Sequence, residues 1–205
     1  MPPLFSQVMT RKDDWRRNYR ISCHDSLVIP KLSALLGRHF QELLVNGRPL
    51  LVLCIGTDRS TGDALGPLTG TRLQELNLPG TVVRGTLEKP VHAANLESTI
   101  REIEEDYSTP LVLALDACLG RAENVGTITV SRGALRPGAG VNKELPPVGE
   151  LYITGTVNVG GFMEYFVLQN TRLGLVHKMA MTIASAIQWA VLRVQSGKEE
   201  ATGEE

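Results

Sequence analysis

Two short, unbroken apolar runs constrain this chain most, because an aspartate follows each of them. Leu50 to Ile55 leads into a glycine-rich loop that ends at Asp63, and Leu111 to Leu115 leads directly into Asp116. Buried parallel strands appear in a sequence as continuous apolar runs, and open α/β sheets carry their sites outside the carboxyl ends of such strands. The two runs therefore predict neighbouring core strands with a carboxyl group at the end of each.

Helical and strand-like segments alternate along the rest of the chain. Apolar spacing predicts helices over residues 30–45, 63–76, 93–107, 160–169 and 173–194, and further strands over 81–85, 127–131 and 151–157. This alternation favours an α/β fold, a three-layer α/β/α sandwich with a mixed, mostly parallel sheet.

The 205 residues contain no obvious linker. We therefore expect a single α/β domain over residues 25–195. A polar, basic segment over residues 1–24 is predicted to be a flexible N-terminal arm, and residues 196–205 a disordered acidic tail.

Charge and cysteine content exclude several classes of protein. The formal net charge of −1 argues against bulk electrostatic binding to nucleic acid or to an anionic membrane. Cys23, Cys54 and Cys118 have no CxxC spacing, which favours free thiols in a reducing compartment. Neither a signal peptide nor an uninterrupted membrane span is recognisable, so we expect a cytoplasmic protein.

The glycine-rich loop does not match the common cofactor motifs. Between Gly56 and Gly66 there is neither a Gly-Lys-Ser/Thr run nor GxGxxG spacing, and GxSxG is absent from the chain. We therefore expect no cofactor. A cation held by Asp58, Asp63 and Asp116 with His92 is a weaker alternative, because a soft transition metal would require more histidine or thiolate.

Each aspartate also has a structural explanation. Asp63 fits the first turn of a helix, where a carboxylate caps backbone amides, and Asp116 fits a strand end that braces a loop. If both lie at neighbouring strand ends, they instead fit an acid–base pair. In such a pair one protonated and one ionised carboxyl polarise a carbonyl and activate water. The residues alone leave both explanations open.

Several motifs in combination resemble a known group of proteins. They are Gly56, Thr61, the run Asp63–Pro67, the run Leu115–Ala117 and the loop Arg136–Lys143. Their order resembles that of the germination protease of spore-forming bacteria and, more closely, of the shorter YyaC-type sporulation proteins, which are predicted spore proteases. The wider resemblance is to the hydrogenase-maturation endopeptidases, whose fold is a phosphorylase/hydrolase-like sandwich. The resemblance covers about residues 25–195.

This resemblance implies an atypical aspartic-type endopeptidase that acts in sporulation or germination. Asp63 and Asp116 would be the catalytic pair, and the substrate-binding residues would be Gly138, Gly140, Asn142 and Lys143. Substrates would be proteins or peptides, such as small acid-soluble spore proteins, in the cytoplasm of the forespore or the spore core. No membrane or direct nucleic-acid partner is expected.

Two departures from the related enzymes limit what the resemblance implies. The maturation endopeptidases have a nickel-binding glutamate where this chain has Ala64, and residues 151–161 offer no counterpart of their histidine. The chain is also shorter than the germination protease, with no room for its propeptide or extra subdomain. A catalytically silent interaction protein of sporulation on a peptidase fold is therefore the alternative. Self-association through Phe162, Met163 and Phe166 is a further possibility.

Overall fold

A computed structural model describes residues 18–45, 47–138 and 145–202. The strands are β1 (Tyr19–Ser22), β2 (Leu50–Cys54), β3 (Thr81–Arg84), β4 (Leu111–Gly120), β5 (Thr127–Arg132) and β6 (Leu151–Val159). The helices are α1 (Val28–Leu43), α2 (Leu65–Leu76), α3 (Leu96–Asp106), α4 (Glu164–Gln169) and α5 (Leu173–Thr202), with short 3-10 turns η2 (Gly62–Ala64) and η3 (Ala122–Asn124).

The six strands form one mixed sheet in the order β1-β5-β6-β4-β2-β3. Strands β3, β2, β4 and β6 are parallel, whereas β5 runs antiparallel to β6 and β1 antiparallel to β5. The predicted α/β fold with a mixed, mostly parallel sheet is therefore confirmed. β2 and β4 are direct neighbours, as the two apolar runs predicted.

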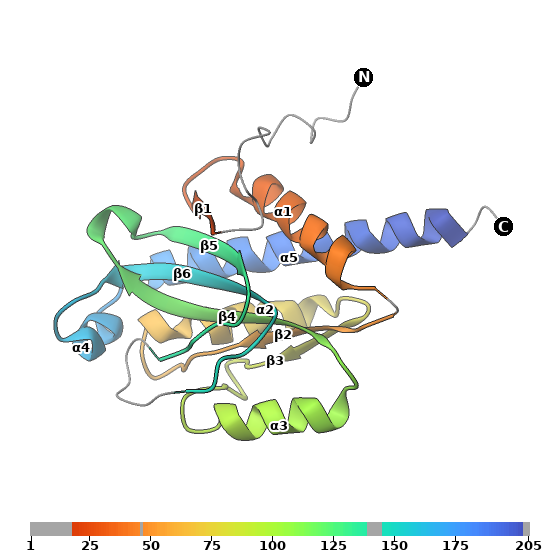
Figure 1. Ribbon diagram of the computed structural model, residues 1–205. Coiled ribbons are helices and arrows are strands. Elements are labelled where there is room, and N and C mark those ends of the chain that lie inside the picture. The colour runs from red at the N-terminus through yellow and green to blue at the C-terminus, as the bar shows by residue number, and fades with distance from the viewer. Residues whose placement is uncertain (1–17, 46, 139–144, 203–205) are drawn as a thin grey trace.

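Helices cover both faces of the sheet and make three layers. Helices α1, α2 and α5 pack on one face and α3 on the other (Figure 1). Strand β2 contributes to both sides: Val52 belongs to the core under α1, α2 and α5, while Leu51 and Leu53 belong to the core under α3. A strand buried on both faces has no polar alternation, which explains its unbroken apolar sequence.

Helix α5 is the central helix of the larger core. By length and composition its segment Leu173–Gly197 could cross a membrane. Its inner face is nevertheless buried inside the fold, with Val176, Met179, Ile183 and Ile187 fully inaccessible. Contacts with α1 and α2 cover that face. The apolar content of α5 is therefore explained by packing in the protein core.

Three predicted boundaries are wrong. Tyr19–Ser22 pairs with β5 as an edge strand, so the predicted arm over 1–24 includes a piece of the sheet. Helix α5 continues to Thr202, through most of the segment that was predicted to be a disordered tail. Strand β4 continues to Gly120 because β6 pairs with it along that length, so Asp116 lies within the strand and not at its end.

Helix α2 approaches the ends of β2 and β3 closely enough that only glycine fits at the contacts. A Cβ on Gly66 would overlap the carbonyl oxygen of Ile55, and one on Gly70 would overlap that of Gly85. Pro67 is tolerated in the same turn because the first amides of a helix have no intrahelical acceptor. The run Asp63–Pro67 (DALGP) thus allows the backbone of α2 to contact the backbone after β2, beside Asp63.

We predict opposite effects for two glycine-to-alanine substitutions within helices. Gly66→Ala should lower the free energy of unfolding by about 1–3 kcal/mol, because the new methyl group meets backbone that cannot yield. At Gly37, in α1, the new Cβ has none of the described atoms within 4 Å. Gly37→Ala should therefore raise the free energy of unfolding by about 0.5–1 kcal/mol through higher helix propensity. Urea denaturation of both variants measures this. Equal effects of the two substitutions would contradict the close approach of α2.

Candidate active site

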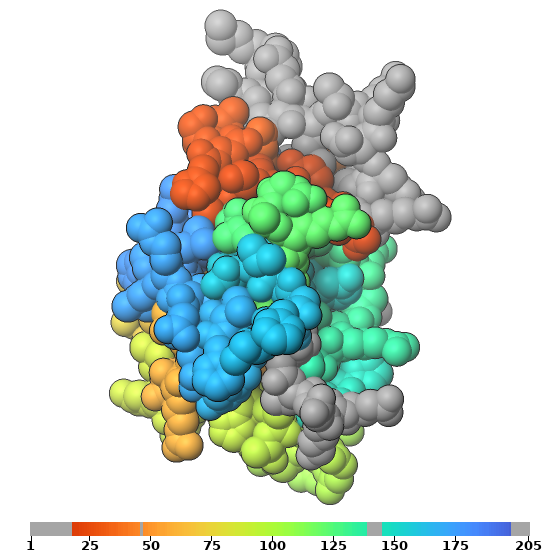
Figure 2. Space-filling view, turned by 90° about the vertical axis from the view of Figure 1, so that its left-hand side faces the viewer, coloured from red at the N-terminus to blue at the C-terminus, as the bar shows by residue number. Residues whose placement is uncertain are grey.

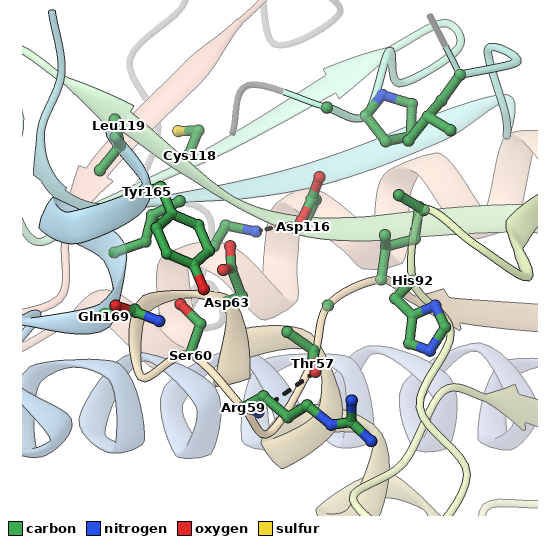
Figure 3. Close-up of a pocket in the computed structure, with 18 residues that line it drawn as sticks. Thr57, Arg59, Ser60, Asp63, His92, Asp116, Cys118, Leu119, Tyr165 and Gln169 are labelled. Carbon is green, nitrogen blue, oxygen red and sulfur yellow. Dashed lines mark hydrogen bonds between the residues drawn. The ribbon is translucent and has the colours of Figure 1, made fainter. Parts of the chain in front are cut away.

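A cleft of about 310 Å³ opens at the carboxyl end of β2, beside β4. Asp63 and Asp116 both line it, together with residues of α4 and of the segment that begins α3 (Figure 3). Most of its other lining side chains are apolar. They include Ile55, Ala93, Ala117, Leu119, Leu145 and Leu168. The structure thus brings the two predicted aspartates into one largely apolar hollow.

The loop after β2 sets the position of Asp63. At Gly56 the backbone turns with a φ of 148°, and a Cβ there would overlap the carbonyl oxygen of Asp63. The Thr57 N–H donates to that same carbonyl at 3.2 Å, which closes the loop onto η2. No side-chain cap bond is made at the start of η2 or α2. Asp63 therefore does not act as the helix cap that its position suggested, and its carboxyl is left to face the cleft.

Asp116 is held by its own strand. Its Oδ1 accepts a hydrogen bond of 2.8 Å from the Ala117 N–H. In β4 the neighbouring residues Leu115 and Ala117 are buried, while Asp116 is half-buried and faces the cleft. The strand thus supplies both the direction of the carboxyl and one of its hydrogen bonds.

Burial makes both carboxyls harder to ionise, but to different extents. It raises the pKa of Asp116 from 3.8 to about 8; the Ala117 N–H opposes this rise and the charge of Asp63 adds to it. The pKa of Asp63 is also raised by burial, and the nearby Ser60 hydroxyl partly offsets that effect. Asp116 is therefore the carboxyl of the pair that holds its proton more strongly.

Two further polar side chains lie at the acid pair and were missed by sequence analysis. In Figure 3 the hydroxyl groups of Ser60 and Tyr165 lie beside the Asp63 carboxyl. Ser60 Oγ is buried and makes no hydrogen bond of normal geometry to the described residues, although it lies close enough to favour the ionised form of Asp63. Ser60 belongs to the loop that the analysis singled out, whereas nothing local in the sequence marks Tyr165 of α4.

The alternative set of metal ligands is not assembled. Asp58 is exposed and lines a neighbouring hollow, and His92 lies across the cleft with its ring apart from the two carboxyls (Figure 3). His92 instead lies in the turn just before α3, where its backbone N–H donates to Asn95 Oδ1 at 2.7 Å. Among the described residues, no three His, Cys, Asp or Glu side chains group as metal ligands.

The predicted substrate-binding residues can be followed only in part. Gly138 lines the cleft, next to Pro137. Gly140, Asn142 and Lys143 lie outside the described residues. Cys118 is half-buried and lines the cleft, whereas Cys23 and Cys54 are buried in the core.

Comparison with known proteins places the chain in a family. Residues 20–186 match the family described as "Protein of unknown function (DUF1256)". The chain belongs to the DUF1256 family. It is 55% identical over 167 residues to the "Uncharacterized protein YyaC" of Bacillus subtilis (strain 168), an alignment that covers 82% of this chain and 80% of that protein. The resemblance to YyaC-type proteins is thus confirmed at the level of the family.

A solved structure shares the fold of this DUF1256 chain. It is the NiFe hydrogenase maturation protease HycI from Thermococcus kodakarensis KOD1, with a TM-score of 0.51. The match covers 75% of this chain and 98% of that one at 18% sequence identity. At this identity the likeness shows the fold alone, and it confirms the predicted similarity to the fold of the maturation endopeptidases.

We predict that Asp116→Asn stabilises the protein in a pH-dependent way. A carboxyl with a pKa of about 8 in the folded state and 3.8 in the unfolded state holds its proton more tightly when folded, so wild-type stability falls as pH rises between those values. The neutral amide avoids that loss. The variant should therefore gain in Tm over wild type at pH 8 by several degrees, and the gain should shrink toward pH 4.

Thermal unfolding from pH 4 to pH 9 measures this difference. Asp58→Asn is the matched control, because Asp58 is exposed on the adjoining loop and its substitution should change Tm little at any pH. A gain for Asp116→Asn that does not depend on pH would contradict the buried, protonated state of Asp116.

Proposed function

We propose that the protein is an endopeptidase in which Asp63 and Asp116 act as an acid–base pair on small proteins of the developing or germinating spore. One observation carries the proposal: two carboxyls share one largely apolar cleft and differ in how strongly they hold a proton. Carboxyl pairs with separated pKa values are typical of acid–base catalysts. The fold that the chain shares with a maturation protease supports the proposal.

The different proton affinities of the two carboxyls suggest which one donates a proton and which one accepts it. Protonated Asp116 donates a hydrogen bond to the oxygen of the scissile carbonyl, and ionised Asp63 removes a proton from the water that attacks the carbonyl carbon. A C–O bond forms and the carbonyl electron pair moves to its oxygen, which takes the proton of Asp116. The C–N bond then breaks, the amine takes the proton from Asp63, and the carbonyl re-forms as the proton returns to Asp116.

Ser60 and Tyr165 fit roles in positioning. A buried hydroxyl without a partner costs free energy, so Ser60 Oγ is expected to gain one when water or a substrate carbonyl enters the cleft. The Tyr165 hydroxyl points into the same region (Figure 3). Both side chains would hold the attacking water beside Asp63, where it can lose its proton.

The substrate class rests on the motif resemblance. The order of the Asp63–Pro67, Leu115–Ala117 and Arg136–Lys143 segments resembles that of the spore germination protease. On that basis small acid-soluble spore proteins are the first substrates to test, in the cytoplasm of the forespore or spore core.

We predict that purified protein cleaves small acid-soluble spore proteins and that both aspartates are needed. Asp63→Asn and Asp116→Asn should each lower the cleavage rate by about 10²–10⁴-fold, the usual contribution of general acid–base catalysis. Asp58→Asn should leave it unchanged, since Asp58 faces a different hollow. The measurement is cleavage followed by electrophoresis and mass spectrometry. Cleavage that survives both substitutions would remove the pair from the mechanism.

The pH dependence of cleavage should be bell-shaped. The rate should fall as pH rises through about 8, because Asp116 then loses the proton that it donates. It should also fall at acidic pH, where Asp63 becomes protonated and can no longer accept a proton from water. A rate that keeps rising well above pH 8 would contradict the assigned role of Asp116.

A catalytically silent sporulation protein is the second candidate, and one observation favours it. Phe162, Met163 and Phe166 are exposed on and beside α4, as is common on protein-binding surfaces. Such a protein would not cleave spore proteins. It would bind a spore protein, and that binding would depend on the three exposed side chains. Binding without cleavage in the same assays would decide for this candidate.

A further inference from the structure

Strand β4 extends beyond its neighbour β2 and leaves one edge free at the cleft. β2 ends at Cys54, opposite Leu115, and the last bond between the two segments runs from the Ile55 N–H to Leu115 O at 2.7 Å. From there to Gly120, β4 pairs with β6 alone within the described part of the chain. Among the described residues, the main chain of β4 therefore has no strand on its other side along the cleft.

Alternation along the strand shows which backbone groups face that side. Leu115 O points toward β2, and Gly120 O points toward β6, where it accepts the Gly160 N–H at 2.8 Å. Successive residues of a strand direct their backbone groups to opposite neighbours. The register irregularity beside Cys118 falls on β6, which has one extra residue there, so it does not disturb this alternation in β4. Ala117 and Leu119 therefore face the free edge, and both line the cleft.

Asp116 lies at the start of this edge. The Ala117 N–H, which would otherwise bond to a neighbouring strand, donates to Asp116 Oδ1. The Ala117 C=O and both backbone groups of Leu119 have no partner among the described residues. A chain that used these groups would run directly past the acid pair.

Exposed apolar side chains stand beside the same cleft. Phe162 is 81% exposed, and Tyr165 and Phe166, which stack edge to face, are 60% and 53% exposed. Tyr165 also lines the cleft, so this apolar surface is continuous with it. Figure 2 shows the α4 segment (blue) on the outer face, next to the connection between β4 and β5 (green).

We infer that the cleft binds its substrate as an extended, apolar segment that adds to the free edge of β4, with side chains packed on Phe162 and Phe166. The inference rests on the proposed function, because it names the form in which that site takes its substrate. Addition of a strand to a sheet edge gives affinity through main-chain bonds, and apolar contacts give selectivity. The segment's backbone would bond to Ala117 O and to the N–H and C=O of Leu119, which brings a peptide bond beside Asp63 and Asp116.

The test uses binding and not cleavage. A fluorescein-labelled peptide, Lys-Val-Phe-Val-Leu-Val-Lys, is titrated with the full chain carrying Asp63→Asn, so that the peptide stays intact. Two comparison peptides have the same sequence with N-methyl groups on one or the other set of alternate amides. N-methylation of one of the two sets should weaken binding at least tenfold, because it removes the peptide N–H groups that would donate to the carbonyl oxygens of β4. N-methylation of the other set should not. Equal binding of all three peptides, or none, would overturn the inference.

Variants of the protein test the apolar side of the site. Phe162→Ser with Phe166→Ser, both at exposed positions, should weaken binding at least tenfold. Trp189→Ser is the matched control, because Trp189 is an exposed aromatic residue of α5 outside the cleft lining, and it should leave binding unchanged. Hydrogen exchange at the Leu119 amide should slow on binding. Unchanged exchange at Leu119, or the same affinity in the double variant, would overturn the inference.

The two proposals can fail separately. The protein could bind the peptide, with binding weakened by N-methylation of one amide set and by the Phe162 and Phe166 substitutions, and yet cleave no protein. That result would overturn the proposed endopeptidase activity and keep the proposed binding site at the edge of β4. Cleavage that needs both aspartates, without these effects of N-methylation and of the α4 variants, would keep the endopeptidase and overturn the β4-edge site.

Discussion

The site depends on the backbone contact between α2 and the end of β2. Gly56 and Gly66 let the loop after β2 fold back and let the first turn of α2 lie directly on Ile55. A side chain at either position would separate the two segments, because the opposing atoms belong to the main chain and cannot rotate away. This contact places Asp63 beside β4, and without it the two carboxyls would not share a cleft.

The two acids reach the cleft from different kinds of structure. Asp63 comes from a 3-10 turn with its own carbonyl held by Thr57, whereas Asp116 projects from the middle of a paired strand. The Ala117 N–H donates to Asp116 and lowers its pKa, but the burial of Asp116 has the larger effect and raises the pKa overall. Asp63 has the Ser60 hydroxyl nearby, which favours its charged form. In the proposed mechanism this asymmetry is what assigns the two carboxyls separate roles.

The sequence predicted the parts of the fold that follow from local pattern. Continuous apolar runs gave β2 and β4 as buried neighbours, and helical spacing gave α1, α2 and most of α5. The end of β4 could not be predicted, because its continuation to Gly120 depends on β6, which pairs with it from a distant part of the chain. The polar strand β1 has no sequence signal either, since only pairing with β5 makes it a strand. The end of α5 was missed for another reason. The charged composition of this segment suggested a disordered tail, but Lys, Glu and Ala also have high helix propensity.

The candidate site shows the same division. Asp63 and Asp116 could be found because each follows an unbroken apolar run in the sequence, and their proximity follows from the parallel pairing of β2 with β4. Tyr165 could not be found, because tertiary packing against η2 and β6 brings α4 to the cleft. Asp63 as a helix cap was a reasonable expectation from its position, but the turn that carries it directs the carboxyl away from the helix amides.

The most direct test of this account is a carboxyl titration by NMR with 13C-labelled aspartate. In the wild-type protein Asp116 should titrate near pH 8, with Asp63 titrating at lower pH but still above its ordinary value. In Asp63→Asn the pKa of Asp116 should fall, because the negative charge that helps to raise it is gone, and it should stay above 3.8 because burial remains. Two carboxyls that both titrate near pH 4 and ignore each other's substitution would contradict the acid–base pair.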